Sequence, residues 1–183
     1  MMEGPTRHSR LMLRYHSGMK RIGVVSDTHL ARDAAKLPAR MLEEIAGVAC
    51  ILHAGDVTCG DVIDRLAQIA PVHCVFGNMD PPELSGMLPS RTLLTVDQVT
   101  IGITHGHLGS GATTPLRALN CFADRPEVGL VVFGHSHEPY LRRHGNALLF
   151  NPGSAIQPRR QPRPSYGMVT IDGVQVTAVH RFL

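Results

Sequence analysis

Tryptophan is absent from this 183-residue sequence, and aromatic residues make up only 4% of it. Platforms that bind single-stranded nucleic acid are built from aromatic side chains, so their scarcity argues against such a partner. Long apolar runs are missing too. The longest, such as 128–133, have the length of a strand and fall far short of the roughly 20 residues that cross a bilayer, so we expect no membrane span.

A general basic charge is also missing, although the formal net charge is +3. The first 21 residues carry five basic residues and one acidic residue, so residues 22–183 sum to a charge of −1. A near-neutral body does not offer the basic surface that a nucleic-acid duplex requires. We therefore expect no nucleic-acid partner.

Cysteines are few, and none of the four lies in a Cys-x-x-Cys pair. Cys50 and Cys74 lie in or beside apolar runs, where a free cysteine packs as a small hydrophobe. Reduced cysteines are typical of intracellular proteins, so the sequence predicts a cytoplasmic location.

The length suits one domain with a core of useful size. Residues 1–18 show neither helical nor strand periodicity, so we expect a disordered extension there and a single domain over 19–183. The extension is rich in arginine and poor in acids, as transit peptides are, but it has no clear amphipathic face.

The spacing of apolar residues predicts an α/β fold. The first half alternates strands and helices, which indicates a parallel sheet with right-handed crossovers. The expected strands are 22–26, 49–52, 72–76 and 130–133, and the expected helices are 37–46, 61–70 and 114–121. The prolines of 81–89 predict a loop, and a hairpin is expected over 91–104 around Asp97-Gln98.

The last third of the chain is mostly β. The expected strands are 140–143, 147–150, 166–171 and 174–180, with turns at Asn146 and Asp172-Gly173. No internal repeat or long linker divides the chain. Two packed sheets with helices outside are therefore the simplest architecture.

Five short polar clusters each follow an apolar run where a strand is expected to end. They are Asp27-Thr28-His29, His53-Ala54-Gly55-Asp56, Gly77-Asn78-Met79-Asp80, Thr104-His105-Gly106-His107 and Gly134-His135-Ser136-His137. Aspartate, asparagine and histidine bind divalent transition metals. Loops at one edge of a sheet can converge on one point, so the clusters together predict a two-metal site and phosphate-ester chemistry.

Each cluster taken alone has a simpler explanation. Asp56 can be a turn residue or a helix N-cap, and each His-x-His pair can be an exposed turn. Asp27 and His29 can face one site only if the chain turns there, because side chains alternate along a strand. The common placement of all five clusters favours the metal site.

These clusters resemble the signature of calcineurin-like metallophosphoesterases. The matching residues are Asp27-x-His29, Gly55-Asp56, Gly77-Asn78, His105 and Gly134-His135-x-His137. Asn151-Pro152-Gly153-Ser154 and Ser165-Tyr166-Gly167-Met168 further resemble the small bacterial YfcE-type phosphodiesterases. The resemblance runs from about Met19 to the C-terminus and implies a four-layer α/β/β/α sandwich of two mixed sheets flanked by helices.

The resemblance also implies two divalent cations, with Mn²⁺ preferred and Fe, Zn, Ni or Co as alternatives. The first would be held by Asp27, His29, Asp56 and His137, and the second by Asp56, Asn78, His105 and His135. Asp56 would bridge the two cations. A hydroxide held between them would then attack the phosphorus of a small phosphate ester, most simply a phosphodiester.

Asp56, Asn78 and His107 are the expected catalytic residues, and Asn78, His107 and Arg159 the expected substrate contacts. His107 can contact the phosphate, protonate the leaving group or only support His105. Arg159 lies in a segment rich in proline and arginine, 158–164, which can bind phosphate or be a solvated loop. Asp80 can orient Asn78 or a nearby histidine, or cap the chain before a proline.

One position departs from the family pattern. Many members carry a histidine directly after the asparagine of the Gly-Asn motif, and YfcE-type members often carry a cysteine. This chain has Met79, which neither donates a strong hydrogen bond nor exchanges protons. We therefore expect modest turnover and a preference for good leaving groups.

Two other functions compete with the phosphoesterase. A similar fold serves as a subunit of the eukaryotic retromer coat, where metal binding is degraded, so a non-catalytic scaffold is the first alternative. The second is a nuclease of the same superfamily, which the length and charge of this chain argue against. Small members of the group often self-associate, so a homo-oligomer remains open.

Overall fold

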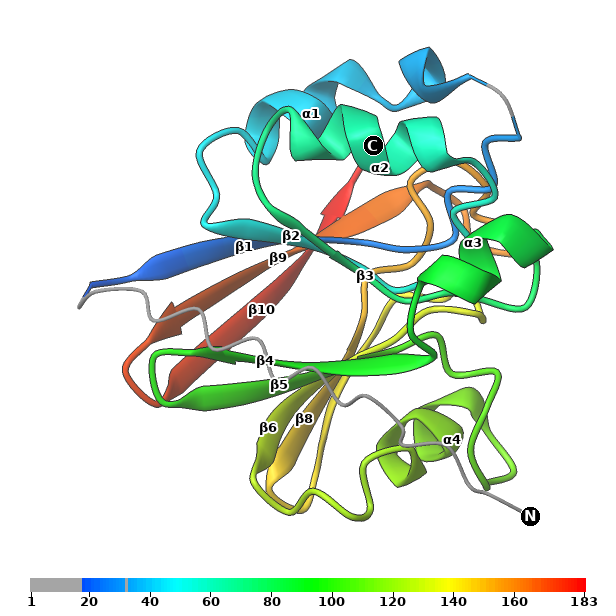
Figure 1. The fold of residues 1–183 in the computed structure, drawn as a ribbon. Coiled ribbons are helices and arrows are strands. Elements are labelled where there is room, and N and C mark those ends of the chain that lie inside the picture. Colours follow the sequence, from blue (N-terminus) through cyan, green and yellow to red (C-terminus); the bar gives the residue numbers. More distant parts are fainter. Residues whose placement is uncertain (1–17, 32) are drawn as a thin grey trace.

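The computed structural model describes residues 18–31 and 33–183, so nearly all of the expected N-terminal extension lies outside the described residues. Two five-stranded sheets pack face to face (Figure 1). The first sheet, in spatial order, contains β10 (Gln175–Phe182), β9 (Ser165–Asp172), β1 (Lys20–Val25), β2 (Cys50–His53) and β3 (Val72–Cys74). The second contains β4 (Arg91–Val96), β5 (Val99–Thr104), β6 (Val128–Val132), β8 (Ala147–Asn151) and β7 (Tyr140–His144).

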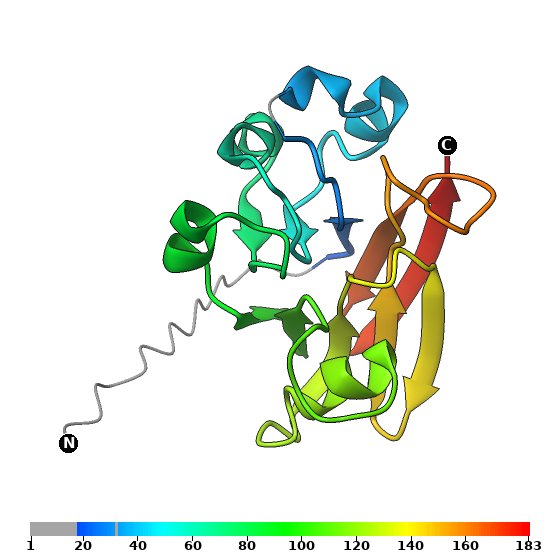
Figure 2. The ribbon, with the colours of Figure 1, turned by 90° about the vertical axis from the view of Figure 1, so that its right-hand side faces the viewer.

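Helices cover the outer faces of both sheets, as Figures 1 and 2 show. The 3-10 turn η1 (Ala34–Lys36), α1 (Ala39–Glu44), α2 (Gly60–Ala67) and α3 (Pro82–Met87) lie on the side of the first sheet, and α4 (Thr114–Asn120) lies on that of the second. The fold is therefore the predicted four-layer α/β/β/α sandwich. Both sheets mix parallel and antiparallel pairs.

Three buried apolar clusters fill the three spaces between these layers. Side chains alternate along a strand, so neighbouring residues of β1 enter different clusters. Val24 packs between the two sheets, whereas Val25 packs toward α1 and α2. In β6, Val132 likewise faces the first sheet and Val131 faces α4. The fully apolar runs in the sequence thus arise because these strands are covered on both faces.

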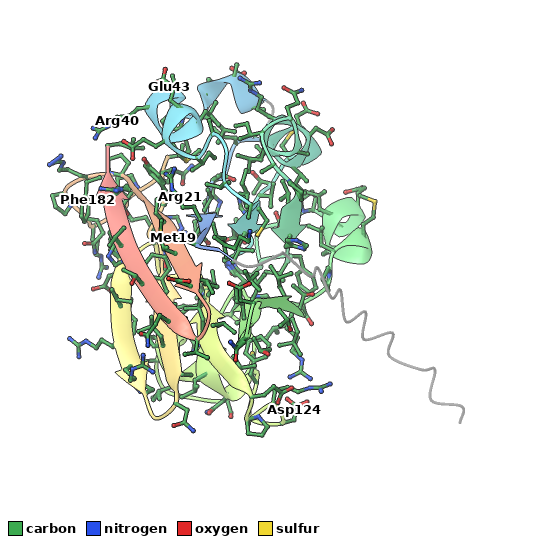
Figure 3. The ribbon with its side chains drawn as sticks, turned by 90° about the vertical axis from the view of Figure 1, so that its left-hand side faces the viewer. Met19, Arg21, Arg40, Glu43, Asp124 and Phe182 are labelled. Atoms are coloured by element: carbon green, nitrogen blue, oxygen red, sulfur yellow. The ribbon has the colours of Figure 1, made fainter. Side chains whose placement is uncertain are left out.

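An ion pair and a hydrogen bond tie α1 to the first sheet. Arg181 Nε of β10 lies 3.7 Å from Glu44 Oε2, and the Arg21 guanidinium donates to the Glu44 carbonyl. Figure 3 shows Arg40 of α1 and Phe182 of β10 at this end of the molecule. Both contacts are exposed to solvent, so each adds little to the stability of the fold.

The prediction of a loop over 81–89 is wrong, because residues 82–87 form α3. Pro82 occupies the first turn, where its fixed φ suits a helix and its missing N–H would have no intrahelical partner. Glu83 places a negative charge in the same turn, and Leu84 is buried. The prolines here begin the helix rather than prevent it.

Other boundaries differ by smaller amounts. The helix expected over 37–46 is shorter in the structure: α1 spans Ala39–Glu44, because Pro38 is its extended N-cap, and the 3-10 turn η1 lies before the expected range. The turn between β9 and β10 lies one residue later than predicted, at Gly173-Val174, since Asp172 pairs with Gln175. The hairpin of β4 and β5 turns at Asp97-Gln98 as predicted.

Parallel strands deliver the polar clusters to one region. β1, β2 and β3 run parallel in the first sheet, and β5 and β6 run parallel in the second. The loops after β1 and β6 meet, because the Asp27 carboxylate accepts the His135 backbone N–H.

Of the helices in the described part of the chain, none has the length and apolar character of a membrane span.

Candidate metal centre

The loops that follow β1, β2 and β6 turn sharply through left-handed backbone conformations. Asp27, His29, Asp56, His135 and His137 all have φ between 47° and 69°. Such values are uncommon for residues other than glycine and concentrate at functional sites. The turn allows Asp27 and His29, two residues apart, to face the same point, as the sequence required.

Two overlapping groups of ligand atoms are compact enough to hold a cation. In each group the atoms lie within 4.8 Å of one another. The groups are Asp27, His29 and His137, and Asp27, Asp56 and His105.

The first group joins residues from both sheets. His137 Nε2 lies 3.3 Å from Asp27 Oδ1 and 3.2 Å from His29 Nε2. The other ring nitrogen of His137, Nδ1, is bonded to the carbonyl of Gln157 and acts as the donor there. Nε2 of neutral His137 therefore presents a lone pair, in the arrangement that metal-binding histidines usually adopt.

The second group centres on Asp56. Its Oδ2 lies 3.3 Å from His105 Nε2 and 3.5 Å from His29 Nε2, so one oxygen faces a histidine from each group. His105 Nε2 also lies 3.2 Å from Asn78 Oδ1. His105 Nδ1 lies 2.7 Å from the carbonyl of Ala54, which fixes the ring.

Two further histidines lie beside these groups rather than within them. The His135 ring centroid is 5.1 Å from that of His105, and the His107 centroid is 5.2 Å from it. The backbone N–H of His135 donates to Asp27. His107 Nδ1 is buried and has no hydrogen-bond partner among the described residues. The structure thus brings all seven expected ligands and His107 together, with His135 and His107 at the margin.

Two glycines of the motifs provide space for the carboxylates. A Cβ at Gly77 would overlap the Asp56 side chain, and a Cβ at Gly134 would overlap the Ser26 hydroxyl and approach Asp27 Oδ2. The Gly-Asn and Gly-His motifs are therefore explained by close packing.

Hydrogen bonds fix one oxygen of each carboxylate. Ser26 Oγ donates to Asp27 Oδ2 at 2.6 Å, and the Met79 backbone N–H donates to Asp56 Oδ1 at 2.8 Å. The other oxygens, Oδ1 of Asp27 and Oδ2 of Asp56, face the histidines. Each carboxylate is thus held in one orientation.

Asp80 has a role that the sequence did not indicate. Its carboxylate accepts the backbone N–H groups of Asp56 at 3.1 Å, Thr58 at 2.6 Å and Gly77 at 2.7 Å. It therefore joins the loops after β2 and β3 through their backbones, instead of orienting Asn78 or a histidine. The sequence shows no signal of this bond, because its partners are main-chain atoms.

The pKa values of the ionisable groups at the centre shift in different directions. Burial raises the pKa of Asp27 to about 6. Burial also raises the pKa of Asp56, but the hydrogen bond from His105 and the charge of His105 have the larger combined effect. The pKa of Asp56 is therefore lowered to about 2. Burial would lower the pKa of His105, yet Asp56 and Asp27 raise it. Burial lowers the pKa of His137 to about 4, so that imidazole is neutral at pH 7.

The donor set fits divalent cations. Carboxylate oxygens and imidazole nitrogens suit transition metals. Around His137 Nε2 the neighbours are a carboxylate oxygen and another imidazole nitrogen, while the lowered pKa disfavours a proton there. A cation would satisfy the facing lone pairs of this group.

Arginines flank the centre on two sides. Arg159 is exposed and has φ of 52°. Burial lowers the pKa of His29, and the positive charge of Arg159 lowers it further. Arg117 of α4 donates from Nε to the Gly106 carbonyl at 3.3 Å, between His105 and His107. Arg159 was predicted; Arg117 was not, because its helix carries no motif.

Comparison with known proteins gives a consistent result. The sequence model described as the calcineurin-like phosphoesterase superfamily domain matches residues 19–173. A protein named probable metallophosphoesterase from Methanothermobacter thermautotrophicus is 36% identical over 160 residues, which cover 86% of this chain and 89% of that protein. Phosphodiesterase YfcE of Escherichia coli K12 is 33% identical over 127 residues, covering 65% of this chain and 64% of its own.

Solved structures share the fold at lower identity. Vps29 of Entamoeba histolytica, described as complexed with Zn²⁺, superposes with a TM-score of 0.68 at 21% identity. The match covers 88% of this chain and 98% of that one. At this identity the likeness establishes the arrangement of the layers and nothing about activity.

Proposed function

This chain belongs to the calcineurin-like phosphoesterase superfamily, and we propose from that premise that it is a divalent-metal-dependent phosphodiesterase acting on small phosphate esters. The observation that carries the proposal is the position of Asp56. One of its oxygens lies 3.5 Å from His29 Nε2 and 3.3 Å from His105 Nε2, between the two groups of candidate ligands. A carboxylate placed in this way is suited to bridge two cations.

The proposed ligands are the seven residues expected from the sequence. Asp27, His29, Asp56 and His137 hold one cation, and Asp56, Asn78, His105 and His135 hold the other. We take Mn²⁺ as the preferred ion for this mixed oxygen and nitrogen set, with Fe, Zn, Ni or Co as alternatives. The Zn²⁺ in the Entamoeba protein supports the capacity of the fold to hold a metal.

Divalent cations supply Lewis acidity at such a centre, because they make water acidic enough to ionise near neutral pH and offset the charge of a phosphate. The residues of this chain then position the substrate. Asn78 is exposed at the edge of the centre and can donate from its amide to a phosphate oxygen. Arg159, on the side of His29, adds a second donor with a fixed positive charge.

His107 is proposed to contact the phosphate. Its pKa is lowered chiefly by burial, so the ring is neutral at pH 7 and carries one N–H donor. The ring lies 5.2 Å from that of His105 and 5.8 Å from that of Phe76, which limits its orientation. A neutral histidine in this place can donate a hydrogen bond without repelling a cation.

A non-catalytic scaffold is the second candidate, because the chain shares its fold with Vps29, whose full name is vacuolar protein sorting 29. The complete set of candidate ligands in this chain argues for catalysis. Metal binding without turnover would favour the scaffold.

The domain is proposed to span 19–183, and the four free cysteines agree with a reducing, cytoplasmic compartment.

The test is hydrolysis of bis-(p-nitrophenyl) phosphate after removal of metal with a chelator and re-addition of Mn²⁺. The wild-type protein should lose activity with the metal and regain it, while Asp56→Ala should remain inactive. Asp61→Ala, an exposed aspartate at the start of α2, is the matched control and should behave as wild type. Equal activity of Asp56→Ala and wild type would reject the proposal.

A further inference from the structure

His53 belongs to one of the five polar clusters, yet it is not among the proposed ligands. Its side chain is completely buried at the end of β2. Nε2 lies 3.2 Å from the hydroxyl oxygen of Thr28, which stands between Asp27 and His29. His53 therefore reaches the loop that carries two of the proposed ligands.

Thr28 connects this loop to the next one. Its hydroxyl donates to the carbonyl of Val57 at 3.4 Å, directly after Asp56. Backbone bonds run alongside: Asp27 N–H donates to the Gly55 carbonyl at 3.0 Å, and His29 N–H to the Asp56 carbonyl at 3.1 Å. The Thr28 side chain thus adds a third link between the two loops.

The hydrogen-bond roles follow from the number of protons. The Thr28 hydroxyl has one proton and gives it to the Val57 carbonyl, so toward His53 it acts as the acceptor. His53 Nε2 is then the donor and Nδ1 carries the lone pair. Nδ1 is buried and has no hydrogen-bond partner among the described residues.

An unpaired buried nitrogen is unfavourable, and an apolar side chain at this position would avoid it. The neighbours on the strand, Ile51 and Leu52, are apolar and fully buried. Packing alone would therefore be served better by a residue such as leucine. The advantage of histidine over leucine at this position is its hydrogen bond to Thr28.

We propose that His53 is a positioning residue of the metal centre, which holds Thr28 so that the loop of Asp27 and His29 keeps its place beside the loop of Asp56. This inference rests on the proposed function, because it assigns a purpose to the spacing of the proposed ligands. His53 acts through Thr28 and touches neither metal nor substrate. Partners of this kind, one step removed from a metal, typically change its affinity about 10- to 100-fold.

The test measures Mn²⁺ affinity by isothermal titration calorimetry on the metal-free protein. His53→Leu should bind Mn²⁺ about 10- to 100-fold more weakly than wild type. His73→Leu is the matched control: His73 lies on the adjacent strand, in register with Leu52, and its buried Nε2 also has no hydrogen-bond partner within 18–31 and 33–183. The Mn²⁺ affinity of this variant should stay within about twofold of wild type, since in the described part of the chain no side-chain hydrogen bond joins His73 to these loops.

Variants of the bond itself separate positioning from packing. Thr28→Val removes the hydroxyl with little change of shape and should weaken Mn²⁺ binding as His53→Leu does, whereas Thr28→Ser should retain the affinity. His53→Gln keeps a donor and should recover part of it. In the double variant His53→Leu/Thr28→Val the loss should be less than the product of the single losses, because both remove one link.

The outcomes are distinct. Suppose that wild type binds Mn²⁺, and that the affinity of Thr28→Val, or of a folded His53→Leu, is within about twofold of the wild-type affinity. Then His53 has no positioning role and this inference is wrong. If His53→Leu does not fold, Thr28→Val and Thr28→Ser decide the question. If wild type itself binds no divalent metal, the proposed function falls first, and this inference with it.

Discussion

The imidazole nitrogens Nε2 of His29 and His137 lie 3.2 Å apart, although the two residues are 108 positions apart in the chain. The rings are stacked, with centroids 5.0 Å apart. His29 follows a strand of the first sheet and His137 a strand of the second, so this contact joins the two halves of the sandwich at the candidate metal centre.

His137→Ala and His105→Ala should each lose one of the two cations. His137 belongs to the first group of ligand atoms and His105 to the second. Metal content after reconstitution and dialysis should fall from two per chain to one. Hydrolysis should fall at least about 100-fold, because even residues one step removed from a metal reach that effect. His144→Ala, on the edge strand β7, is the control and should change neither value.

Met79→His should increase turnover. The Met79 side chain is 58% exposed, so a histidine fits without repacking, and the backbone bond from residue 79 to Asp56 is kept. A proton donor near the leaving group contributes about 100-fold or more when well placed. The gain should be larger for an alkyl ester than for a p-nitrophenyl ester, which leaves easily. Unchanged rates for a diester and a monoester alike would count against this explanation.

Mn²⁺ affinity should fall as the pH falls through about 6. Burial raises the pKa of Asp27 to about 6, so below this pH a proton must leave before a cation binds. The protonated form of His105, which Asp56 and Asp27 favour against burial, adds a second proton to displace. Each displaced proton weakens binding about tenfold per pH unit below its pKa. Calorimetry between pH 5 and pH 7.5 checks this; a constant affinity would contradict it.

Asp80→Ala should destabilise the protein by about 3 kcal/mol, because three backbone N–H groups lose a charged acceptor. Urea denaturation of the metal-free protein measures the effect without a contribution from metal binding. Asp64→Ala, an exposed aspartate of α2, should cost less than about 0.5 kcal/mol. A similarly small cost for Asp80→Ala would show that the backbone bonds do not depend on the carboxylate.

The sequence predicted the sheets and the convergence of the clusters well, since both follow from local patterns. Apolar runs such as 128–133 mark strands that are covered on both faces, and polar residues directly after them mark the loops. The helix α3 was missed because Pro81-Pro82 signals a turn as readily as a helix start. The single buried residue of that helix, Leu84, left no apolar periodicity to decide between the two.

The parts of the centre that could not be predicted depend on contacts between distant segments. Asp80 acts on main-chain groups, Arg117 donates to the Gly106 carbonyl, and His53 acts through Thr28. None of these pairs has a fixed spacing along the chain. The left-handed conformation of Asp56, with φ of 54°, was likewise not predictable, because only a minority of aspartates adopt it.

The central claim is that two cations share Asp56. Crystals of the protein grown with Mn²⁺ and measured at the manganese absorption edge test it most directly. The account predicts two anomalous peaks, one between Asp56 and the pair His29 and His137, the other between Asp56 and His105. A single peak, or peaks that do not contact Asp56, would contradict it.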